Sequence, residues 1–351
     1  MERPRTLRGF SLPVLAVVLL GACGAPSGTV PGTDLMVLEG RAQGTTFTIK
    51  YLDSLGRDLS GPVDSLLRAI DRSLSLWDTS STVSRFNSMD SLRTSDMHFQ
   101  RFVRASRHFA EITGGAFDPS VMPLVAAWGF GPGGAGAADT TRLDSLRGLV
   151  GMERVLANDM AAMYSSSFPP EIVFRKERPG VRLDPNGIAQ GHTVDVLAQY
   201  LLQLGIADLM VEVGGEVRAH GVNDRGTPWV MQIDKPVDGP EHVRQTTVPL
   251  EDRALATSGN YRKFREVGGR RFGHTIDPRT GRPVEHGLLS ASVLAQDAAS
   301  ADAIGTALMV MGPDPARAWL ADHPEFEAYL VMDDGQGGMS VWTTPGWPVT
   351  R

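Results

Sequence analysis

Three segments in the C-terminal third of the chain carry residue types that can act together in catalysis. The segment His274–Pro283 reads His-Thr-Ile-Asp-Pro-Arg-Thr-Gly-Arg-Pro, so a titratable imidazole stands directly before a turn-forming sequence. Upstream, Thr257–Arg262 contains a glycine that allows close backbone approach. Downstream, Ser300–Leu308 has helical periodicity. Together they offer a proton acceptor, an approachable backbone and oxygen ligands for a metal ion.

The metal ligands lie on the helix expected over residues 298–311. Asp302 and Thr306 are four residues apart, so both side chains project from one face of a helix. A carboxylate and a hydroxyl are oxygen ligands suited to a hard divalent cation such as Mg²⁺. The rest of this helix is apolar, and a carboxylate in such surroundings is costly unless it is paired or metal-bound. The alternative is that Asp302 caps the helix or pairs with an Arg.

Strands are mixed with helices throughout the chain. Period-two and helical patterns predict the following elements: strands over 45–51, 181–184, 209–213, 246–250, 288–294, 328–332 and 339–342, and helices over 63–74, 99–113, 190–204 and 298–311. Glycines are expected to end two of these helices, Gly114-Gly115 the second and Gly205 the third.

Two glycine-rich stretches bear on ligand binding. Gly214-Gly215 follows a predicted strand, and it is equally consistent with close approach of a ligand and with a plain turn. The stretch 130–136 lacks the strand before it and the helix after it that a dinucleotide fingerprint requires. We therefore expect 130–136 to be a surface loop.

The N-terminus has the features of an export signal. Arg3, Arg5 and Arg8 precede an apolar run over 12–20 that is too short to span a bilayer. The run ends in Leu-Gly-Ala-Cys, and Cys23 is the only cysteine in the chain, so no intrachain disulfide can form. The sequence predicts a signal peptide over 1–22 and a Gly-, Pro- and Ser-rich tether over 23–34. A mature domain is expected over 35–351.

Composition limits the classes of function. The chain is 42% apolar and carries a formal charge of −6, which becomes more negative once the Arg-rich residues 1–22 are removed. An acidic domain without clustered Lys and Arg is a poor nucleic-acid binder, because binding phosphates needs concentrated positive charge. No run after the signal is long enough to cross a membrane.

Seven motifs follow one another along the mature chain: Gly114–Asp118, Trp128–Gly131, Asp184–Asp195, Val213–Glu216, Ser258–Arg262, His274–Pro283 and Ala301–Gly312. In this order they resemble the motifs of the ApbE-type FAD:protein FMN transferases, and the resemblance covers nearly all of the mature length. Cys23 resembles the lipidated cysteine of bacterial lipoproteins. The resemblance implies an α+β fold with mixed or antiparallel sheets, packed helices and two intimately associated lobes that hold FAD between them.

The resemblance also implies roles for individual residues. It assigns Mg²⁺ to Asp302, Thr306 and the carbonyl of Ala189, and catalysis to His274. It assigns FAD contacts to eight positions: Gln43, Trp77, Ala116, Phe117, Asp118, Asn186, His192 and Ile276. The sequence departs from the family at Gln43, where many members have Met, and at Gln190, where Lys or Glu is common.

The function that follows is Mg²⁺-dependent transfer of FMN from FAD to a Thr or Ser hydroxyl of a partner flavoprotein, with release of AMP. The enzyme is expected to be exported and lipid-anchored on the periplasmic or extracytoplasmic side of a bacterial membrane, with membrane-associated or exported flavoproteins as acceptors. One alternative is an FAD pyrophosphatase, because water can replace the acceptor hydroxyl. Another is a flavin-binding assembly lipoprotein without turnover.

Overall fold

The computed structural model describes residues 33–132, 141–158, 169–237, 243–260, 264–267 and 270–348, with only the backbone described for 264–267, 270 and 271. Cys23, the signal segment and nearly all of the tether lie outside the described residues. So do Tyr261, Arg262 and most of the 130–136 loop.

An antiparallel sheet of eight strands forms the centre of the molecule. Its spatial order is β1-β2-β6-β7-β10-β15-β16-β17, and every neighbouring pair is antiparallel. The strands are β1 (Asp34–Ala42), β2 (Thr45–Asp53), β6 (Leu209–Val213), β7 (Glu216–His220), β10 (Ala254–Gly259), β15 (Leu288–Ala295), β16 (Glu327–Asp333) and β17 (Met339–Thr343).

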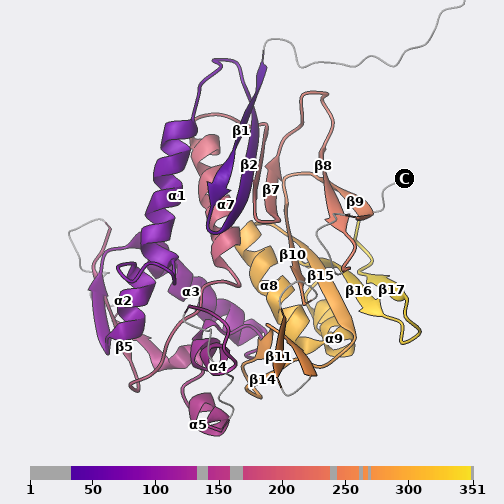
Figure 1. The fold of residues 1–351 in the computed structure, drawn as a ribbon. Helices are drawn as coiled ribbons and strands as arrows, with labels where there is room; N and C mark the ends of the chain where they lie inside the picture. Colours follow the sequence, from indigo (N-terminus) through magenta and orange to yellow (C-terminus); the bar gives the residue numbers. More distant parts are fainter. Residues whose placement is uncertain are drawn as a thin grey trace, which may run out of the picture.

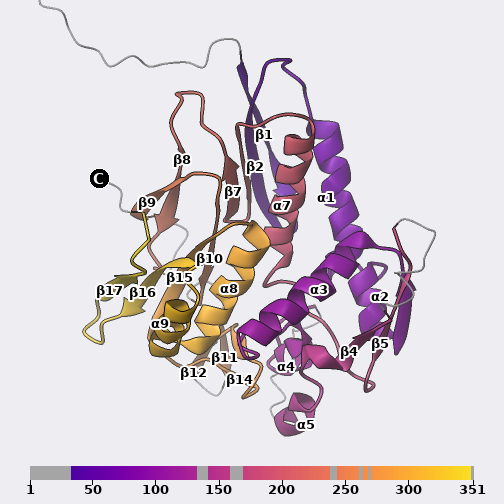
Figure 2. The ribbon, with the colours of Figure 1, turned by 180° about the vertical axis from the view of Figure 1, so that it is seen from behind.

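Helices cover one face of this sheet and a two-stranded ribbon covers part of the other. The helices are α1 (Ser60–Leu74), α7 (Ala189–Gln203), α8 (Ala298–Met311) and α9 (Pro313–Asp322) (Figures 1 and 2). The ribbon is β8 (Trp229–Asp234) with β9 (Arg244–Leu250), and its inward side chains pack on Met210, Val217 and Leu255. The sheet is therefore buried on both faces along its centre, which gives α8 a rigid support.

The chain between α1 and α7 forms the second lobe. It contains α2 (Thr82–Ser88), β3 (Ser91–Thr94), α3 (Met97–Ile112), the 3₁₀ turns η1 (Pro119–Val121) and η2 (Met152–Arg154), α4 (Met122–Ala127), α5 (Leu143–Arg147), β4 (Val155–Ala157) and β5 (Ile172–Lys176). Its three strands pair in the order β3-β5-β4. One hydrophobic core runs from Phe99 and Phe174 in this lobe to Ile304 and Leu308 on α8. The two lobes are thus intimately associated, and the α+β fold is confirmed.

Most of the predicted elements are present. The amphipathic pattern predicted over 63–74 belongs to α1, and α3 ends before Gly114 and Gly115, whose φ values of 58° and 78° are left-handed. Gly214 and Gly215 form the two-residue turn between β6 and β7, with φ of 67° and 108°. This geometry is that of a plain hairpin turn.

The strand predicted over 181–184 is wrong. Val181 and Leu183 are buried as a strand pattern requires, but the segment pairs with no strand. The side-chain amide of Asn87 instead binds the Leu183 backbone twice, accepting from N–H at 2.7 Å and donating to C=O at 2.8 Å. Asp184 N–H donates to the carbonyl of Pro119 at 2.7 Å. One side chain and one turn therefore replace the missing strand partner.

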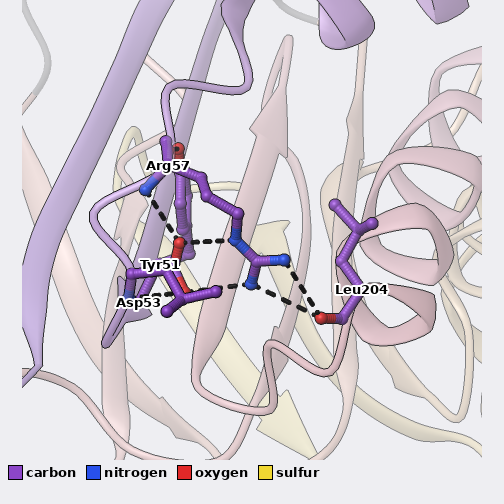
Figure 3. A network of polar contacts seen from close by, with 5 residues as sticks. Tyr51, Asp53, Arg57 and Leu204 are labelled. Atoms are coloured by element: carbon purple, nitrogen blue, oxygen red, sulfur yellow. Dashed lines mark hydrogen bonds and ion pairs between the residues drawn. The ribbon is translucent and has the colours of Figure 1, made fainter.

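A polar network fixes the C-terminal end of α7 (Figure 3). The Arg57 guanidinium donates to both carboxylate oxygens of Asp53 at 2.8 and 2.9 Å and to the Leu204 carbonyl at 3.3 Å. Tyr51 donates to the Arg57 carbonyl at 2.6 Å. The hydrogen bond from Arg57 lowers the pKa of Asp53 to about 2. A cation at the negative end of a helix is stabilising, so this network ties α7 to the end of β2.

The N-terminal end of α7 is held by close backbone contact with α8. A Cβ added to Gly191 would lie 2.3 Å from the Ala298 carbonyl oxygen and 2.8 Å from Ala299 Cα. These are backbone atoms and cannot move aside as a flexible side chain can. Only glycine therefore permits the two helices to approach this closely.

We expect Gly191→Ala to destabilise the protein, because the new methyl group must push α7 away from α8. Overpacking of this kind costs about 1–3 kcal/mol, which denaturant unfolding can measure. Gly61→Ala is the matched control, since Gly61 lies on α1 and no atom is within 4 Å of an added Cβ. The control should leave stability unchanged or raise it. Equal stability of the two variants would contradict the close contact between α7 and α8.

Candidate active site

Asp302 lies where α8 meets the first turn of α7. Its side chain is 5% exposed, and its Oδ2 accepts a hydrogen bond of 3.1 Å from Gly191 N–H. Asp297, not Asp302, caps α8 by accepting from Ser300 N–H. No Arg or Lys lies within ion-pair distance of Asp302 in the part of the chain that the structure describes. Asp302 is therefore neither the cap of its own helix nor half of an ion pair.

Burial dominates the electrostatics of Asp302. Loss of solvent raises the pKa of this carboxyl to about 7, against the opposing effect of the hydrogen bond from Gly191, and the nearby Asp195 raises it further. Asp195 is a half-buried carboxylate that accepts from Ala298 and Ala299 N–H and pairs with Arg218 at 2.8 Å. A cation beside Asp302 would supply the compensation that the protein itself does not.

Ala189 begins α7, and its carbonyl is held by a short polar chain. The Thr193 hydroxyl donates to the Ala189 carbonyl at 2.8 Å, and the Gln43 side-chain amide donates to Thr193 Oγ1 at 2.7 Å. Gln43 stands in the turn between β1 and β2 with a left-handed φ of 53°, and its Oε1 is buried with no hydrogen-bond partner among the described residues. The structure thus brings Gln43 to the N-terminus of α7.

Thr306 follows Asp302 by one turn and reaches the loop that leads into α7. A Cβ on Gly187 would lie 3.1 Å from Thr306 Oγ1 and 3.3 Å from the ring of Phe117. Phe117 is buried, so the sequence motif that contains it packs under the same loop. These contacts bring Gln43, Phe117, Asp302 and Thr306 against residues 187–193, the segment that contains Ala189 and starts α7.

The donor set at this point fits a hard cation. It offers a carboxylate, a hydroxyl and a backbone carbonyl, which are all oxygens. No group of three or more His, Cys, Asp or Glu side chains that could hold a metal occurs within the described ranges. The oxygen set matches Mg²⁺ better than a soft or borderline metal, which favours sulfur and imidazole ligands.

His274 lies in the segment between two small hairpins. These are β11 (Phe264–Val267) with β12 (Arg270–Gly273), and β13 (Ile276–Asp277) with β14 (Arg282–Pro283). Both views place them between α4 and the lower end of α8 (Figures 1 and 2). Val284 N–H donates to the Thr275 carbonyl at 3.1 Å, and the Asp277 carboxylate binds the Arg279 guanidinium at 2.9 and 3.0 Å. The turn after His274 is therefore rigidly built.

The remaining positions assigned to FAD differ in exposure. Trp77, in the turn after α1, is 74% exposed, and Asn186 is also exposed. Ala116 and Ile276 are buried, and Asp118 caps η1 through hydrogen bonds to Ser120 while burial raises its pKa. A cavity of about 630 Å³ opens beside Asp118. Its other lining residues include Gly115, Met152 and Arg279. Trp77 and the cavity are accessible to a ligand. The side chains of Ala116 and Ile276 are buried and expose little surface for a ligand to contact.

The structure also reveals a histidine pair that sequence analysis missed. Nδ1 of His98 lies 3.0 Å from Nε2 of His192, with the rings edge to face. Burial, followed by the His98 imidazole, lowers the pKa of His192 to about 4. The pair joins α3 to the first turn of α7. No local signal could have revealed it, because the two residues are 94 positions apart.

Comparison with known proteins agrees with this arrangement. The model of the ApbE family matches residues 43–330. The chain belongs to this family. Proteins named FAD:protein FMN transferase from Vibrio cholerae and Haemophilus influenzae are 33% and 32% identical to it, over 94% and 87% of this chain and 96% and 88% of their own.

Solved structures of the ApbE family have the same fold. The flavin transferase ApbE from Vibrio cholerae matches with a TM-score of 0.74 and 31% identity, covering 89% of this chain and 98% of its own. The apo form of the flavinyl transferase ApbE from Pseudomonas stutzeri matches with 0.76 and 31%, covering 89% and 95%. Within the described residues of the present chain, no helix has the length and apolar character needed to cross a membrane.

The raised pKa of Asp302 predicts how stability depends on pH in the absence of metal. A carboxyl whose folded-state pKa lies above its unfolded value destabilises the fold as pH rises from about 4 to about 7. Asp302→Asn removes this charge. In EDTA, urea unfolding between pH 4.5 and 8 should show wild type losing stability relative to the variant, by an amount on the order of 2–4 kcal/mol. A difference in unfolding free energy that stayed constant across that pH range would show that burial does not raise the pKa of Asp302.

Proposed function

We propose that this chain transfers FMN from FAD to a Thr or Ser hydroxyl of an acceptor protein, in a Mg²⁺-dependent reaction that releases AMP. The relatives that match most of its length share the name FAD:protein FMN transferase. The observation that carries the proposal is Asp302, a buried carboxylate without a cationic partner among the described side chains, held at the start of α7 by the N–H of Gly191.

Asp302, Thr306 and the Ala189 carbonyl would hold the metal ion. When bound, Mg²⁺ neutralises charge on a diphosphate and so favours phosphoryl transfer. The protein fixes the donors through the Gly191–Asp302 hydrogen bond and the chain from Gln43 through Thr193 to Ala189. The N-terminus of α7 adds the positive end of a helix dipole, which also attracts phosphate.

His274 is the group that accepts the proton. The acceptor oxygen forms a bond to the phosphorus of the FMN half, the bond between that phosphorus and the bridging oxygen breaks, and AMP leaves with the bridging oxygen. The hydroxyl proton passes to the His274 imidazole, because histidine is a side chain that can take up a proton near neutral pH. General base catalysis of this kind contributes about 10²–10⁴-fold to a rate.

The acceptor would be an exported or membrane-associated flavoprotein. The basis for this part is the N-terminal sequence, whose signal-like run ends at the sole cysteine, Cys23. Lipidation at Cys23 would anchor the mature chain on the extracytoplasmic side of a bacterial membrane. The Gly- and Pro-rich residues after it would let the enzyme reach partners in that plane.

The reaction is tested with FAD, Mg²⁺ and candidate flavoproteins, followed by mass spectrometry of the acceptor. We expect the acceptor to gain the mass of FMN less one water on Thr or Ser, with AMP as the other product. His274→Gln should still bind FAD but transfer FMN about 10²–10⁴-fold more slowly. EDTA and Asp302→Ala should each abolish transfer.

Two outcomes would overturn the proposed reaction. Undiminished release of free FMN with a proven acceptor present, and no labelled protein, would identify a pyrophosphatase. Tight FAD binding with neither FMN release nor labelling would leave a binding protein that assists assembly. Full activity of Asp302→Ala in EDTA would exclude the proposed metal site.

Anchoring is tested separately with Cys23→Ala. We expect this variant to leave the membrane fraction, because a lipid chain can be attached at no other cysteine of the sequence. Transfer activity of the released protein should equal that of wild type, since Cys23 precedes the folded domain. Unchanged membrane fractionation of Cys23→Ala would contradict the lipoprotein assignment.

A further inference from the structure

Asn260 stands at the end of β10 and contacts the residues on both sides of His274. Its Oδ1 accepts from the Thr275 hydroxyl at 2.9 Å and from Thr275 N–H at 3.4 Å. On the other side of His274, a Cβ added to Gly273 would lie 2.5 Å from Asn260 Oδ1. One amide side chain therefore spans the backbone of the tripeptide whose centre is His274.

Asn260 is itself tied to the central sheet. Its N–H donates to the Leu289 carbonyl at 3.2 Å, directly after the pairing of β10 with β15. Thr275 is held from the opposite side by Val284 N–H, which donates to its carbonyl. The backbone around His274 is thus fixed to two separate elements, and Asn260 provides the connection to the sheet.

The same end of β10 touches the helix that carries the proposed metal ligands. A Cβ on Gly305 would lie 3.0 Å from Ser258 Oγ, so α8 and β10 approach closely at this point. Gly305 immediately precedes Thr306, and Ser258 lies two residues before Asn260. A short, packed path therefore runs from Thr306 through Gly305 and Ser258 to Asn260 and His274.

We infer that Asn260 is a positioning residue for His274: by binding Thr275 and filling the space beside Gly273, it sets where the imidazole stands relative to the ligands on α8. This inference rests on the proposed function, in which His274 accepts the acceptor proton. Asn260 touches neither substrate nor the transferred group in this account. It acts through the backbone on either side of His274.

The test is a double-mutant cycle on FMN transfer. Asn260→Ala should lower the transfer rate about 10- to 100-fold, a part of the general-base contribution, and leave the dissociation constant for FAD unchanged. In the His274→Gln background the same substitution should cost less than about 3-fold, because the group that Asn260 positions is gone. A residue that only stabilises the fold would lower the rate by the same factor in both backgrounds.

Two further variants separate position from folding. Asn260→Asp keeps an oxygen that accepts from Thr275 and should recover most of the rate lost in Asn260→Ala. Thr275→Val removes the hydroxyl from the other partner, and its effect should not add to that of Asn260→Ala. The matched control is Asn223→Ala, since Asn223 Oδ1 accepts from the Thr227 hydroxyl at 3.1 Å in an exposed turn. That control should transfer FMN at the wild-type rate.

Wild-type protein in the same assay distinguishes the two hypotheses. Absence of acceptor labelling by wild type would refute the proposed function itself. Wild-type labelling with an unchanged rate in Asn260→Ala would overturn only the inference about Asn260. The inference would also be overturned if Asn260→Ala lowered the transfer rate by the same factor in wild type and in His274→Gln. It would be overturned as well if Asn260→Asp recovered none of the lost rate.

Discussion

The site depends on the contact between α7 and α8. Each helix supplies a carboxylate that accepts hydrogen bonds from backbone N–H groups at the N-terminus of the other. Asp302 on α8 accepts from Gly191 N–H in the first turn of α7, where Ile188 provides no side-chain cap. Asp195 on α7 accepts from Ala298 and Ala299 N–H at the start of α8. Helix N-termini carry unpaired N–H groups and partial positive charge, so both carboxylates are stabilised there. The reciprocal bonds fix the register between the helices, and Gly191 lets them come close enough to form.

This arrangement leaves Asp302 incompletely compensated. One N–H bond cannot replace the hydration of a carboxylate that is 5% exposed, and burial accordingly raises its pKa. Asp195 is better supplied, with two backbone donors and Arg218. The two carboxylates on these touching helices are therefore compensated to different degrees. Asp195 holds the helices together, whereas the incomplete compensation of Asp302 is what supports the proposed cation site there.

Much of the fold could be predicted because its signals are local. Periodicity predicted α1, α3 and α7, each of which buries one face of its own sequence, and the apolar run of α8 predicted a helix that is buried nearly all round. The strand over 181–184 failed because its partner is the Asn87 side chain, which no period reveals. The role of Asp302 stayed open for the same reason, since Gly191 lies 111 positions away. Three further contacts also join residues that are distant in the sequence, so local patterns could not predict them. They are Gly187 with Thr306, Thr193 with Gln43, and His98 with His192. Resemblance to a family could name site residues, but only the packing shows how they are held.

Helix α8 contacts both the segment at the proposed metal site and the strand that leads to His274, the proposed base. Its face at Asp302 and Thr306 meets the start of α7, and its face at Gly305 meets β10. From β10 the chain continues to Asn260, which binds Thr275 beside His274. The proposed metal ligands and the proposed base are therefore both positioned from one buried helix by close-packed contacts, although His274 itself lies between two small hairpins. Close-packed interiors deform little. A distance between His274 and α8 that is set by packed contacts therefore varies less than one set by a free loop. Phosphoryl transfer needs that constraint, because its catalysis depends chiefly on placing the attacking oxygen in line with the phosphorus.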